Sequence, residues 1–228
     1  MDKVLLVIPA FNEEKNIERV VEDLVRGFPQ LDYVVVNDGS RDCTAKICRE
    51  KGYNLLDLPV NLGLAGCFQA GMKYAYRKGY RYAIQFDGDG QHRPEYIEAM
   101  RQKMEEGYDI VIGSRFVTEK KGWSARMIGS RVIGSAIRLT TGTRVTDPTS
   151  GMRMFNRKMI EEFALNRNYG PEPDTVSFLI KQGARVAELQ VTIDERTEGE
   201  SYLKPLTAVH YMARMLISIL MIQNFRKR

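Results

Sequence analysis

Carboxylate and amide side chains follow an apolar run near the middle of the sequence. The run Tyr82–Phe86 is followed by Asp87-Gly88-Asp89-Gly90-Gln91. Two carboxylates two residues apart at the end of a strand, with an amide oxygen close by, suit a hard divalent cation that keeps open positions for substrate phosphates. The segment therefore predicts a Mg2+ or Mn2+ site formed by Asp87, Asp89 and Gln91.

A calcium-binding loop is the other metal site that this spacing suggests, with Glu98 as its last ligand. Such a loop needs glycine at its sixth position for a sharp turn, and it lies between helices. His92 occupies that position, and the preceding run is typical of a strand. We therefore exclude the calcium loop, and we interpret His92 as a polar turn residue without a chemical role.

Basic side chains are concentrated in one stretch of the chain. Residues 115–144 hold seven Lys and Arg against one acidic residue, a balance of +6, whereas the whole chain carries +5. Such a stretch indicates an anionic partner. It has few aromatic side chains between its basic ones and no groove-reading motif, so we exclude nucleic acid. We interpret Lys121 and Arg144 as solvated side chains.

If a group is transferred to an acceptor at such a metal site, the kind of acceptor decides which side chains the reaction needs. A phosphate monoester is already ionised at neutral pH, so it needs cations that neutralise and orient it, a task that suits the planar fork of arginine. A hydroxyl acceptor must lose a proton and needs a general base, for which Asp174 or Glu172 is the candidate. The basic stretch and Arg196 favour the phosphate acceptor.

Alternating strands and helices must position these side chains in the first half of the chain. Short runs rich in Val, Ile and Leu predict buried strands, and amphipathic segments between them predict helices, the second of which Ser40 could cap. The order predicts an open α/β sheet, whose ligands bind at the carboxyl ends of the strands. The expected strands are Val4–Ile8, Tyr33–Val36, Asn54–Leu58, Tyr82–Phe86 and Asp109–Ile112, and the expected helices are Glu13–Arg26, Arg41–Lys51, Leu64–Arg77 and Pro94–Glu105.

The second half of the chain has a less regular pattern. Its last segment is apolar nearly all round and ends in Arg226-Lys227-Arg228. We expect this segment to lie on a membrane surface, or to dock to a small integral-membrane partner or a second copy, rather than only to cover the sheet. The pattern predicts helices over Ala125–Leu139, Pro173–Lys181 and Pro205–Phe225, strands over Met152–Phe155 and Arg185–Ile193, and polar loops over Val117–Trp123 and Arg196–Lys204.

The composition is that of an ordinary globular protein. The 228 residues are 43% hydrophobic and 28% charged, which excludes low-complexity and disordered chains. Three cysteines without a CxxC pair argue against a disulfide framework or a structural zinc site. We find neither a signal-peptide pattern nor an apolar run long enough to span a membrane. We therefore expect a cytoplasmic protein that lies peripherally on the inner face of the cell membrane.

Several motifs resemble glycosyltransferase family 2, whose members have the GT-A fold. They are Ile8-Pro9-Ala10-Phe11-Asn12-Glu13, Asn37-Asp38-Gly39-Ser40 and Asp87-Gly88-Asp89-Gly90-Gln91. Three more are similar to the branch of dolichyl-phosphate mannosyltransferases and bacterial polyprenyl-phosphate hexose synthases, namely Gly113-Ser114-Arg115-Phe116, Asp147-Pro148-Thr149-Ser150-Gly151 and Arg196-x-x-Gly199-x-Ser201. The resemblance covers nearly the whole chain. It departs at Asn37, where the family often has Asp, and at Tyr202, where the branch usually has Lys.

The resemblance implies an α/β fold with the Rossmann-like GT-A arrangement, an open mixed, mostly parallel sheet flanked by helices, with a C-terminal amphipathic helix. We divide the chain into a catalytic domain over residues 1–204 and a C-terminal helix over 205–228. The implied reaction is the inverting transfer of a Glc, GlcNAc or Man type hexose from a nucleotide diphosphate sugar, which we expect to be UDP-linked, to a polyprenyl phosphate such as undecaprenyl phosphate. The alternatives are an enzyme that extends a cell-surface polysaccharide on a hydroxyl acceptor with Asp174 as base, and a nucleotidyltransferase.

The resemblance also assigns residues to the donor, the metal and the acceptor. The nucleotide sugar would bind Pro9, Ala10, Phe11, Glu13, Asp38, Gly63, Asp87, Gly88 and Asp89. The divalent ion, Mg2+ or Mn2+, would bind Asp87, Asp89 and Gln91. The acceptor phosphate would bind Arg115, Arg126, Ser130, Arg131, Arg196 and Ser201. The catalytic set would be Asp89, Arg115, Arg126 and Arg196.

Overall fold

The computed structural model describes residues 3–88, 90–166, 170–194 and 205–224. Within these residues a seven-stranded sheet has the order β3-β2-β1-β4-β6-β5-β7. β6 runs antiparallel to β4 and β5, and the other paired strands are parallel. This confirms the prediction of a mixed, mostly parallel sheet. The strands are β1 (Val4–Ala10), β2 (Asp32–Asn37), β3 (Leu55–Asp57), β4 (Tyr82–Gln85), β5 (Ile110–Ser114), β6 (Arg153–Asn156) and β7 (Val186–Gln190).

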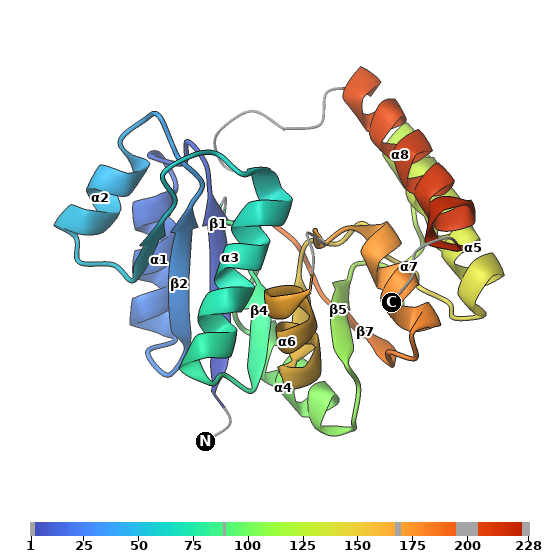
Figure 1. Cartoon of the computed structure of the whole chain (residues 1–228), viewed down its shortest axis with the longest axis horizontal. Coiled ribbons are helices and arrows are strands. Elements are labelled where there is room, and N and C mark those ends of the chain that lie inside the picture. The colour runs from blue at the N-terminus through green and yellow to red at the C-terminus, as the bar shows by residue number, and fades with distance from the viewer. Residues whose placement is uncertain (1–2, 89, 167–169, 195–204, 225–228) are drawn as a thin grey trace.

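Helices cover both faces of the sheet, as Figure 1 shows. α3 and α6 lie side by side across one face, whereas α5, α7 and α8 gather at one end of the molecule. A short 3-10 turn, Ile222–Asn224, follows α8. The helices are α1 (Ile17–Gly27), α2 (Thr44–Glu50), α3 (Gly63–Lys78), α4 (Tyr96–Glu105), α5 (Ala125–Thr141), α6 (Arg157–Leu165), α7 (Pro173–Lys181) and α8 (Pro205–Leu220).

Alternate residues of β1 enter two separate cores. Leu5 and Val7 pack in the core beneath α3 and α6, whereas Val4, Leu6 and Ile8 pack in the core beneath α1 and α4. Strands that are buried on both faces are apolar throughout rather than at every second residue. This is why continuous apolar runs were a sufficient signal for the strands of the first half of the chain.

Helix α2 begins later than predicted, at Thr44 rather than Arg41. The prediction that Ser40 caps this helix is wrong, because the Ser40 hydroxyl accepts a hydrogen bond from the Asn12 N–H at 3.0 Å. Asp42 is the local acceptor instead, and its Oδ1 receives the Thr44 N–H at 3.0 Å. Ser40 therefore joins two loops rather than starting a helix.

Helix α6 is an element that the sequence pattern did not indicate. It follows β6 without a loop, and the Asn156 side chain caps it by accepting a hydrogen bond from the Met159 N–H at 3.0 Å. Ile160 and Phe163 are buried beneath it. Asparagine is a favoured capping residue, so an Asn followed by apolar residues at helical spacing is the signal that this segment contained.

The C-terminal helix α8 packs against α5 and α7 (Figure 1). Gly129 of α5 lies so close to Met212 that an added Cβ would be 1.7 Å from the sulfur atom. Met215 and Ile219 are buried in the core, whereas Ile217 is 54% exposed. The described helices include none that is long and apolar enough to cross a membrane. α8 therefore covers the core and also leaves an exposed apolar edge.

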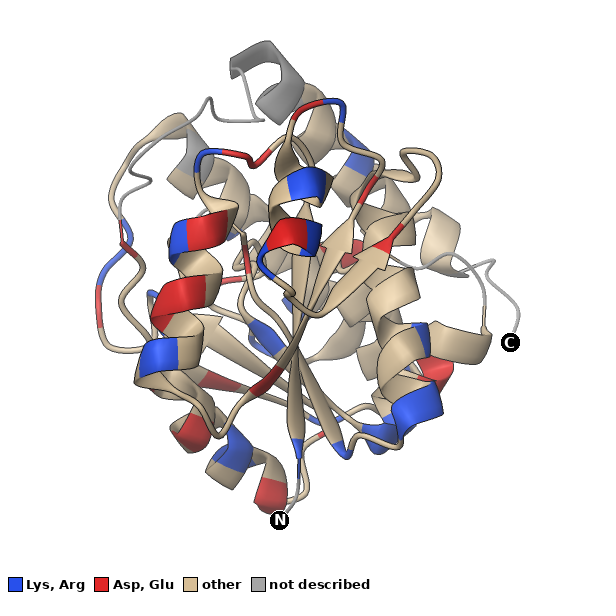
Figure 2. Ribbon diagram, turned by 90° about the vertical axis from the view of Figure 1, so that its left-hand side faces the viewer, with Lys and Arg blue, Asp and Glu red and all other residues tan. Residues whose placement is uncertain are grey.

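Charges of both signs are interspersed on the helices at the opposite end of the molecule, as Figure 2 shows. Arg26 and Glu22 form an ion pair within α1. Lys51, which follows α2, forms another with Glu18 of α1. Exposed pairs of this kind contribute little to stability. They leave no concentration of one sign on this side, so the positive excess of the chain lies elsewhere, in residues 115–144.

Candidate active site

The loops that follow β1 and β2 are hydrogen-bonded to each other at the carboxyl edge of the sheet. The Asn12 N–H donates to the Ser40 hydroxyl at 3.0 Å, and the Asp38 N–H donates to the Ala10 carbonyl at 2.9 Å. Asn12 has a φ of 57°, a left-handed conformation that asparagine tolerates better than most residues. Phe11 lies between these contacts and is 44% exposed. The residues of both loops that are predicted to bind the nucleotide sugar therefore lie at the same edge of the sheet.

Asp38 organises the loop that precedes α3. It is buried, its Oδ1 accepts a hydrogen bond from the Leu62 N–H at 2.7 Å, and its carbonyl accepts one from the Asn61 side chain at 3.0 Å. Gly39 has a φ of +64°, and an added Cβ would meet the backbone of residues 60 and 61 at 2.7 Å. Gly63, at the start of α3, has a φ of +72°. Asp38 thus shapes the wall of the predicted nucleotide-sugar site, and its direct contact with the nucleoside stays a prediction.

The other residues predicted to bind the nucleotide sugar, in and after β1 and β4, lie at the same edge of the sheet. The Glu13 carboxylate accepts a hydrogen bond from the Asn16 side chain at 2.8 Å, which fixes the entry to α1. A Cβ on Gly88 would lie 3.0 Å from the Pro9 carbonyl oxygen. Glycine at position 88 therefore allows the ends of β1 and β4 to approach each other closely.

Asp87 lies directly after β4 and is contacted by His92. The Asp87 N–H donates to His92 Nδ1 at 3.0 Å, and His92 Nε2 lies 3.4 Å from Asp87 Oδ2. The His92 side chain is 2% exposed, and its ring meets the Phe86 ring edge-on. The interpretation of His92 as a polar turn residue is therefore wrong, because the side chain is buried against a predicted metal ligand.

The residues at this edge fit a hard divalent cation. The Asp87 side chain is 36% exposed, and a Cβ on Gly151 would lie 2.7 Å from Asp87 Oδ2, so any residue but glycine would clash with the carboxylate here. The Gln91 amide nitrogen donates to the Asp194 carbonyl at 3.0 Å, which fixes its side chain. The described residues contain no group of three His, Cys, Asp or Glu side chains that could bind a metal, and Asp89 lies outside them. The predicted set offers carboxylate and amide oxygens, which are the ligands that Mg2+ and Mn2+ prefer.

At the end of β5, Arg115 forms a bidentate ion pair with the buried Asp147. Arg115 Nε lies 2.7 Å from Oδ2, and Nη2 lies 2.9 Å from Oδ1. Burial alone would raise the pKa of Asp147, but the hydrogen bonds and charge of Arg115 outweigh burial and hold the pKa below its ordinary value. Glu188 of β7 also accepts the Asp147 N–H at 2.8 Å. The guanidinium of Arg115 is thus fixed in orientation while 21% of the side chain stays exposed.

Lys121 is half-buried beside α5, so its interpretation as a solvated side chain is wrong. Its Nζ donates to the buried Ser130 hydroxyl at 2.8 Å. Burial lowers the pKa of Lys121, the charge of Asp147 opposes this shift, and the charges of Arg115 and Arg131 add to it. Lys121 therefore lies near two other cations and two carboxylates, Asp147 and Glu188, and an anionic ligand would offset the effect of the cations on its charge.

Arg131 holds the loop that contains Lys121. Its guanidinium donates to the carbonyls of Lys121 and Gly122 at 2.5 and 2.9 Å, and it stacks on the Trp123 ring at 4.6 Å from the ring centre. These contacts fix the predicted polar loop that follows Arg115. The structure therefore gives Arg131 a role in shaping the site, and its contact with an acceptor phosphate stays a prediction.

Residues 147–151, which we call the linking loop, connect the cationic side chains with Asp87. The first residue of the loop binds Arg115, and the hydroxyl of its third residue lies 3.4 Å from the Ser130 hydroxyl. Its last residue, Gly151, packs against the Asp87 carboxylate. Five consecutive residues therefore bring a carboxylate suited to a metal and cations suited to a phosphate into one site.

The structure thus gathers the predicted residues that it describes into two groups joined by the linking loop. Pro9, Ala10, Phe11, Glu13, Asp38, Gly63, Asp87, Gly88 and Gln91 lie around the carboxyl ends of β1, β2 and β4, and Arg115, Ser130 and Arg131 lie at the end of β5 and along α5. Asp89, Arg196 and Ser201 lie outside the described residues, as does the side chain of Arg126 in α5.

Three residues that shape the site had no role assigned from the sequence. They are His92, Lys121 and Asp147. Their position in the sequence could have indicated a role, because each lies within or beside a motif or the basic stretch. Their partners depend on loop conformations that spacing along the chain does not determine.

Glu172 and Asp174, the candidate bases for a hydroxyl acceptor, bind α8. The Tyr211 hydroxyl donates to Glu172, and the Ser218 hydroxyl donates to Asp174 Oδ2 at 2.6 Å. Burial raises the pKa of Tyr211, and the charge of Glu172 raises it further, so the phenol remains a neutral donor. Both carboxylates therefore dock the C-terminal helix, which disfavours a role for either as a base.

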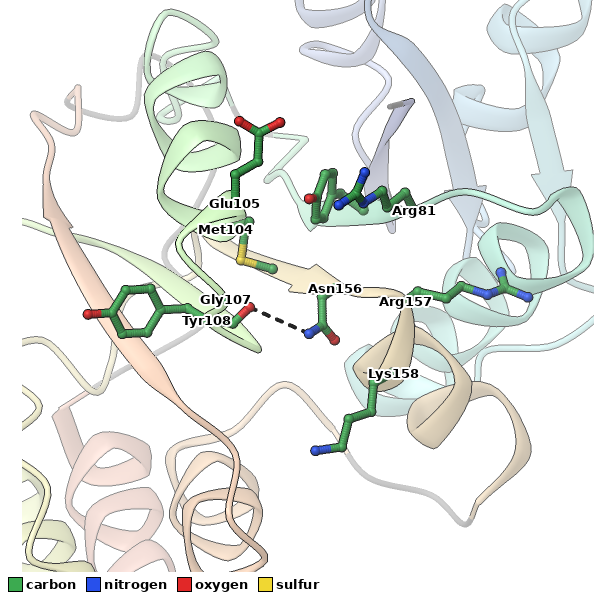
Figure 3. A pocket seen from close by; sticks show the side chains of 9 residues that line it. Arg81, Met104, Glu105, Gly107, Tyr108, Asn156, Arg157 and Lys158 are labelled. Atoms are coloured by element: carbon green, nitrogen blue, oxygen red, sulfur yellow. Dashed lines mark hydrogen bonds between the residues drawn. The ribbon is translucent and has the colours of Figure 1, made fainter. Parts of the chain in front are cut away.

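A cavity of about 280 Å3 lies at the opposite edge of the sheet, as Figure 3 shows. In Figure 3 the Asn156 side chain points toward the Tyr108 carbonyl, 3.5 Å away. The cavity lies at the amino ends of β4 and β5, whereas ligands of such sheets bind at the carboxyl ends. We therefore do not place the active site there. Its lining contains none of the predicted site residues and consists of Arg81, Tyr82, Met104, Glu105, Gly107, Tyr108, Asn156, Arg157 and Lys158.

The fold and the site motifs define a class of protein. Residues 5–164 match the family model of glycosyl transferase family 2, and the chain belongs to this family. The chain resembles the crystal structure of glucosyl-3-phosphoglycerate synthase from Mycobacterium tuberculosis in complex with Mn2+, UDP-glucose and phosphoglyceric acid. The TM-score is 0.74 at 19% identity, and the match covers 100% of this chain and 81% of the other. This likeness confirms the predicted GT-A fold.

Two curated relatives are named for sugar transfer to lipid phosphates. The chain is 28% identical over 212 residues to the polyprenol monophosphomannose synthase of Mycolicibacterium smegmatis, which covers 87% of this chain and 80% of the relative. It is 32% identical over 182 residues to the UDP-N-acetylglucosamine–dolichyl-phosphate N-acetylglucosaminyltransferase of Methanococcus voltae, which covers 70% of this chain and 72% of the relative.

Proposed function

We propose that the protein transfers a Glc, GlcNAc or Man type hexose from a UDP-linked sugar to a polyprenyl phosphate such as undecaprenyl phosphate, with inversion at the anomeric carbon. The observation that carries this proposal is the linking loop, which contacts Asp87 at one end and Arg115 at the other. The names of the two curated relatives, one a polyprenol phosphate enzyme and the other a user of a UDP sugar, support it.

On the donor side, the loops after β1 and β2 would hold the nucleoside, with the exposed Phe11 beside it. Asp87, Asp89 and Gln91 would hold a Mg2+ or Mn2+ ion, which supplies Lewis-acid stabilisation of the charge that develops on the leaving diphosphate. Carboxylates alone would repel a diphosphate, so the donor site needs this positive charge.

On the acceptor side, the phosphate is already ionised and needs no general base. Arg115, which Asp147 orients, and Lys121, which neighbouring cations crowd, would neutralise it together with the buried Ser130 hydroxyl. A phosphate oxygen then attacks the anomeric carbon from the face opposite the diphosphate, so the new bond forms as the old one breaks and the configuration inverts. Arg126, Arg196 and Ser201 remain predicted contacts of the same phosphate.

The first test is a screen of UDP and GDP sugars against undecaprenyl phosphate, with the product identified by mass. We expect a glycolipid that is heavier than the acceptor by one hexose or N-acetylhexosamine residue, together with free UDP. EDTA should abolish transfer, and Mg2+ or Mn2+ should restore it. Full activity in EDTA would contradict the proposed metal site.

The same screen separates the alternatives. A product formed on a sugar hydroxyl, with bare polyprenyl phosphate unused, would support the enzyme that extends a polysaccharide. Release of pyrophosphate rather than UDP would indicate a nucleotidyltransferase.

We also propose that residues 1–204 form the catalytic domain and that the helix in residues 205–228 places it on the inner face of the cell membrane, where a polyprenyl phosphate resides. Apolar side chains are exposed on both helices at this end of the molecule, namely Ile128, Val132 and Leu139 of α5 and Ile217 and Leu220 of α8. Exposed Arg138 and Arg214 on the same helices suit anionic lipid headgroups. A small integral-membrane partner and a second copy of the chain are the other occupants that this surface would fit.

A further inference from the structure

Both ring nitrogens of His92 lie close to one residue, Asp87. Nδ1 accepts the Asp87 N–H at 3.0 Å, and Nε2 lies 3.4 Å from Oδ2 of the same aspartate. A backbone N–H can only donate, so Nδ1 is the acceptor nitrogen and the ring proton lies on Nε2, the nitrogen that is 3.4 Å from the carboxylate. A single imidazole thus contacts the backbone and the side chain of Asp87 at the same time.

Few other side chains orient the Asp87 carboxylate. Among the described residues, the Gln85 amide nitrogen lies 3.5 Å from Oδ1, at the limit of a hydrogen bond. Gly151 approaches Oδ2 so closely that an added Cβ would lie 2.7 Å away. The oxygen that lies nearest His92 is therefore also the one that the linking loop approaches, while 36% of the Asp87 side chain stays exposed.

Packing alone does not account for this arrangement. The His92 side chain is 2% exposed and meets the Phe86 ring edge-on, a place that a phenyl ring of similar size would fill. Burying two ring nitrogens is unfavourable unless both have partners. Asp87 provides the hydrogen-bond partner of Nδ1 and places a carboxylate oxygen 3.4 Å from Nε2, so the histidine fits a requirement to orient Asp87 better than a requirement for bulk.

We propose that His92 is a positioning residue that sets the rotamer of Asp87 for the donor diphosphate and its divalent ion, an inference that rests on the proposed function. Side chains that hydrogen-bond to a metal ligand orient it, and their loss typically weakens metal binding by about 10- to 100-fold. His92 touches neither reactant in this proposal and acts through Asp87.

Three substitutions separate the two contacts. His92→Asn keeps an acceptor near the position of Nδ1 but removes the group that faces the carboxylate. His92→Gln carries its amide nitrogen to the region of Nε2 and loses the backbone contact. His92→Phe fills the space and loses both contacts. His210→Asn, at an exposed histidine of α8, is the matched control.

The readout is Mn2+ binding in the presence of UDP, followed by electron paramagnetic resonance without turnover, beside KM for each substrate and the unfolding temperature. We expect His92→Asn to weaken Mn2+ binding by about tenfold and to raise KM for the donor but not for the acceptor. His92→Gln should recover most of the Mn2+ affinity, and His210→Asn should match the wild type.

Unchanged Mn2+ affinity and donor KM in His92→Asn would overturn the proposal, even if the unfolding temperature falls, because that pattern belongs to a packing role. If His92→Phe fails to fold, the comparison between the Asn and Gln variants still distinguishes a positioning role of His92 from a packing role. The binding assay contains no acceptor. A wild-type protein that binds Mn2+ and UDP but ignores polyprenyl phosphate would therefore refute the proposed acceptor while the variants still test His92.

Discussion

Lys121 keeps its ammonium group in surroundings that disfavour the charge. Burial and the nearby Arg115 and Arg131 lower its pKa, against the opposing effect of Asp147. A bound phosphate would supply negative charge and raise the pKa again, so acceptor binding would stabilise the protonated lysine. At a pH between the pKa of the free enzyme and that of the complex, binding the acceptor therefore takes up a proton.

The lowered pKa of Lys121 predicts how the KM for the acceptor depends on pH. As pH rises through the lowered pKa of Lys121, the free enzyme loses the proton, so KM for polyprenyl phosphate should increase below the pH at which an ordinary lysine titrates. Lys121→Arg should remove this increase, because a guanidinium stays protonated throughout. The measurement is acceptor KM from neutral pH to about pH 10.

Lys120→Arg, at the exposed neighbouring lysine, serves as the control and should follow the wild type. An identical pH dependence in the wild type and Lys121→Arg would show that Lys121 does not contact the acceptor phosphate.

At the scale of elements, the contacts between α7 and α8 bear on whether Asp174 could serve as a base for a hydroxyl acceptor. Asp174 Oδ2 accepts a hydrogen bond from the Ser218 hydroxyl of α8 at 2.6 Å, and Oδ1 accepts one from the Thr175 N–H of its own helix at 2.8 Å, so both oxygens are engaged. A general base contributes about 10²- to 10⁴-fold to a rate. Asp174→Asn should therefore leave kcat close to the wild-type value, whereas Lys121→Met should raise acceptor KM.

Transfer rates with undecaprenyl phosphate, together with unfolding temperatures, check this prediction. A loss of kcat of about 10²-fold or more in Asp174→Asn, without a fall in stability, would restore the hydroxyl-acceptor mechanism.

The apolar pattern predicted β1, β2, β4 and β5 to within two residues at each end. Burial on both faces makes such strands apolar throughout, so the signal was local. The place of β6 between β4 and β5 was not predictable in this way, because order along the chain does not determine strand pairing. β6 even begins with Arg153, which is fully buried. Its guanidinium donates to the carbonyls of Pro148 and Pro171, which stabilises the buried charge.

The candidate site was predictable as a set of residues but not as a set of contacts. Motif spacing placed Asp38, Asp87 and Arg115 after strands of one sheet, and in the structure they follow β2, β4 and β5 at its carboxyl edge. That Arg115 binds Asp147, and that His92 binds Asp87, depends on how two loops fold against each other. Motif spacing does not determine which side chains of two loops meet, so these two contacts could not be predicted from it.

At the scale of the whole molecule, the exposed apolar edge predicts where the protein meets lipid. Ile217→Glu combined with Met221→Glu should markedly reduce sedimentation with vesicles that contain phosphatidylglycerol, because these side chains are 54% and 61% exposed on and just after α8. Raised salt should weaken binding further by screening the basic side chains. Sedimentation of the variants with such vesicles is the measurement.

Val25→Glu is the matched control, since Val25 is 46% exposed on α1 at the other end of the molecule. Unaltered vesicle binding in the double variant, accompanied by a change from dimer to monomer in sedimentation velocity, would assign this surface to a second copy of the chain instead.

Because β6 follows both of its neighbours in the sequence, the strands of the sheet must pair in a certain order during synthesis. β4 and β5 leave the ribosome before the strand that separates them, so β4 has a vacant edge until residue 156 has been made. The first 85 residues already contain every pairing among β3, β2, β1 and β4. The half of the sheet formed by β3, β2, β1 and β4 can therefore assemble on a nascent chain, whereas β5 joins the same sheet only after β6 has been made.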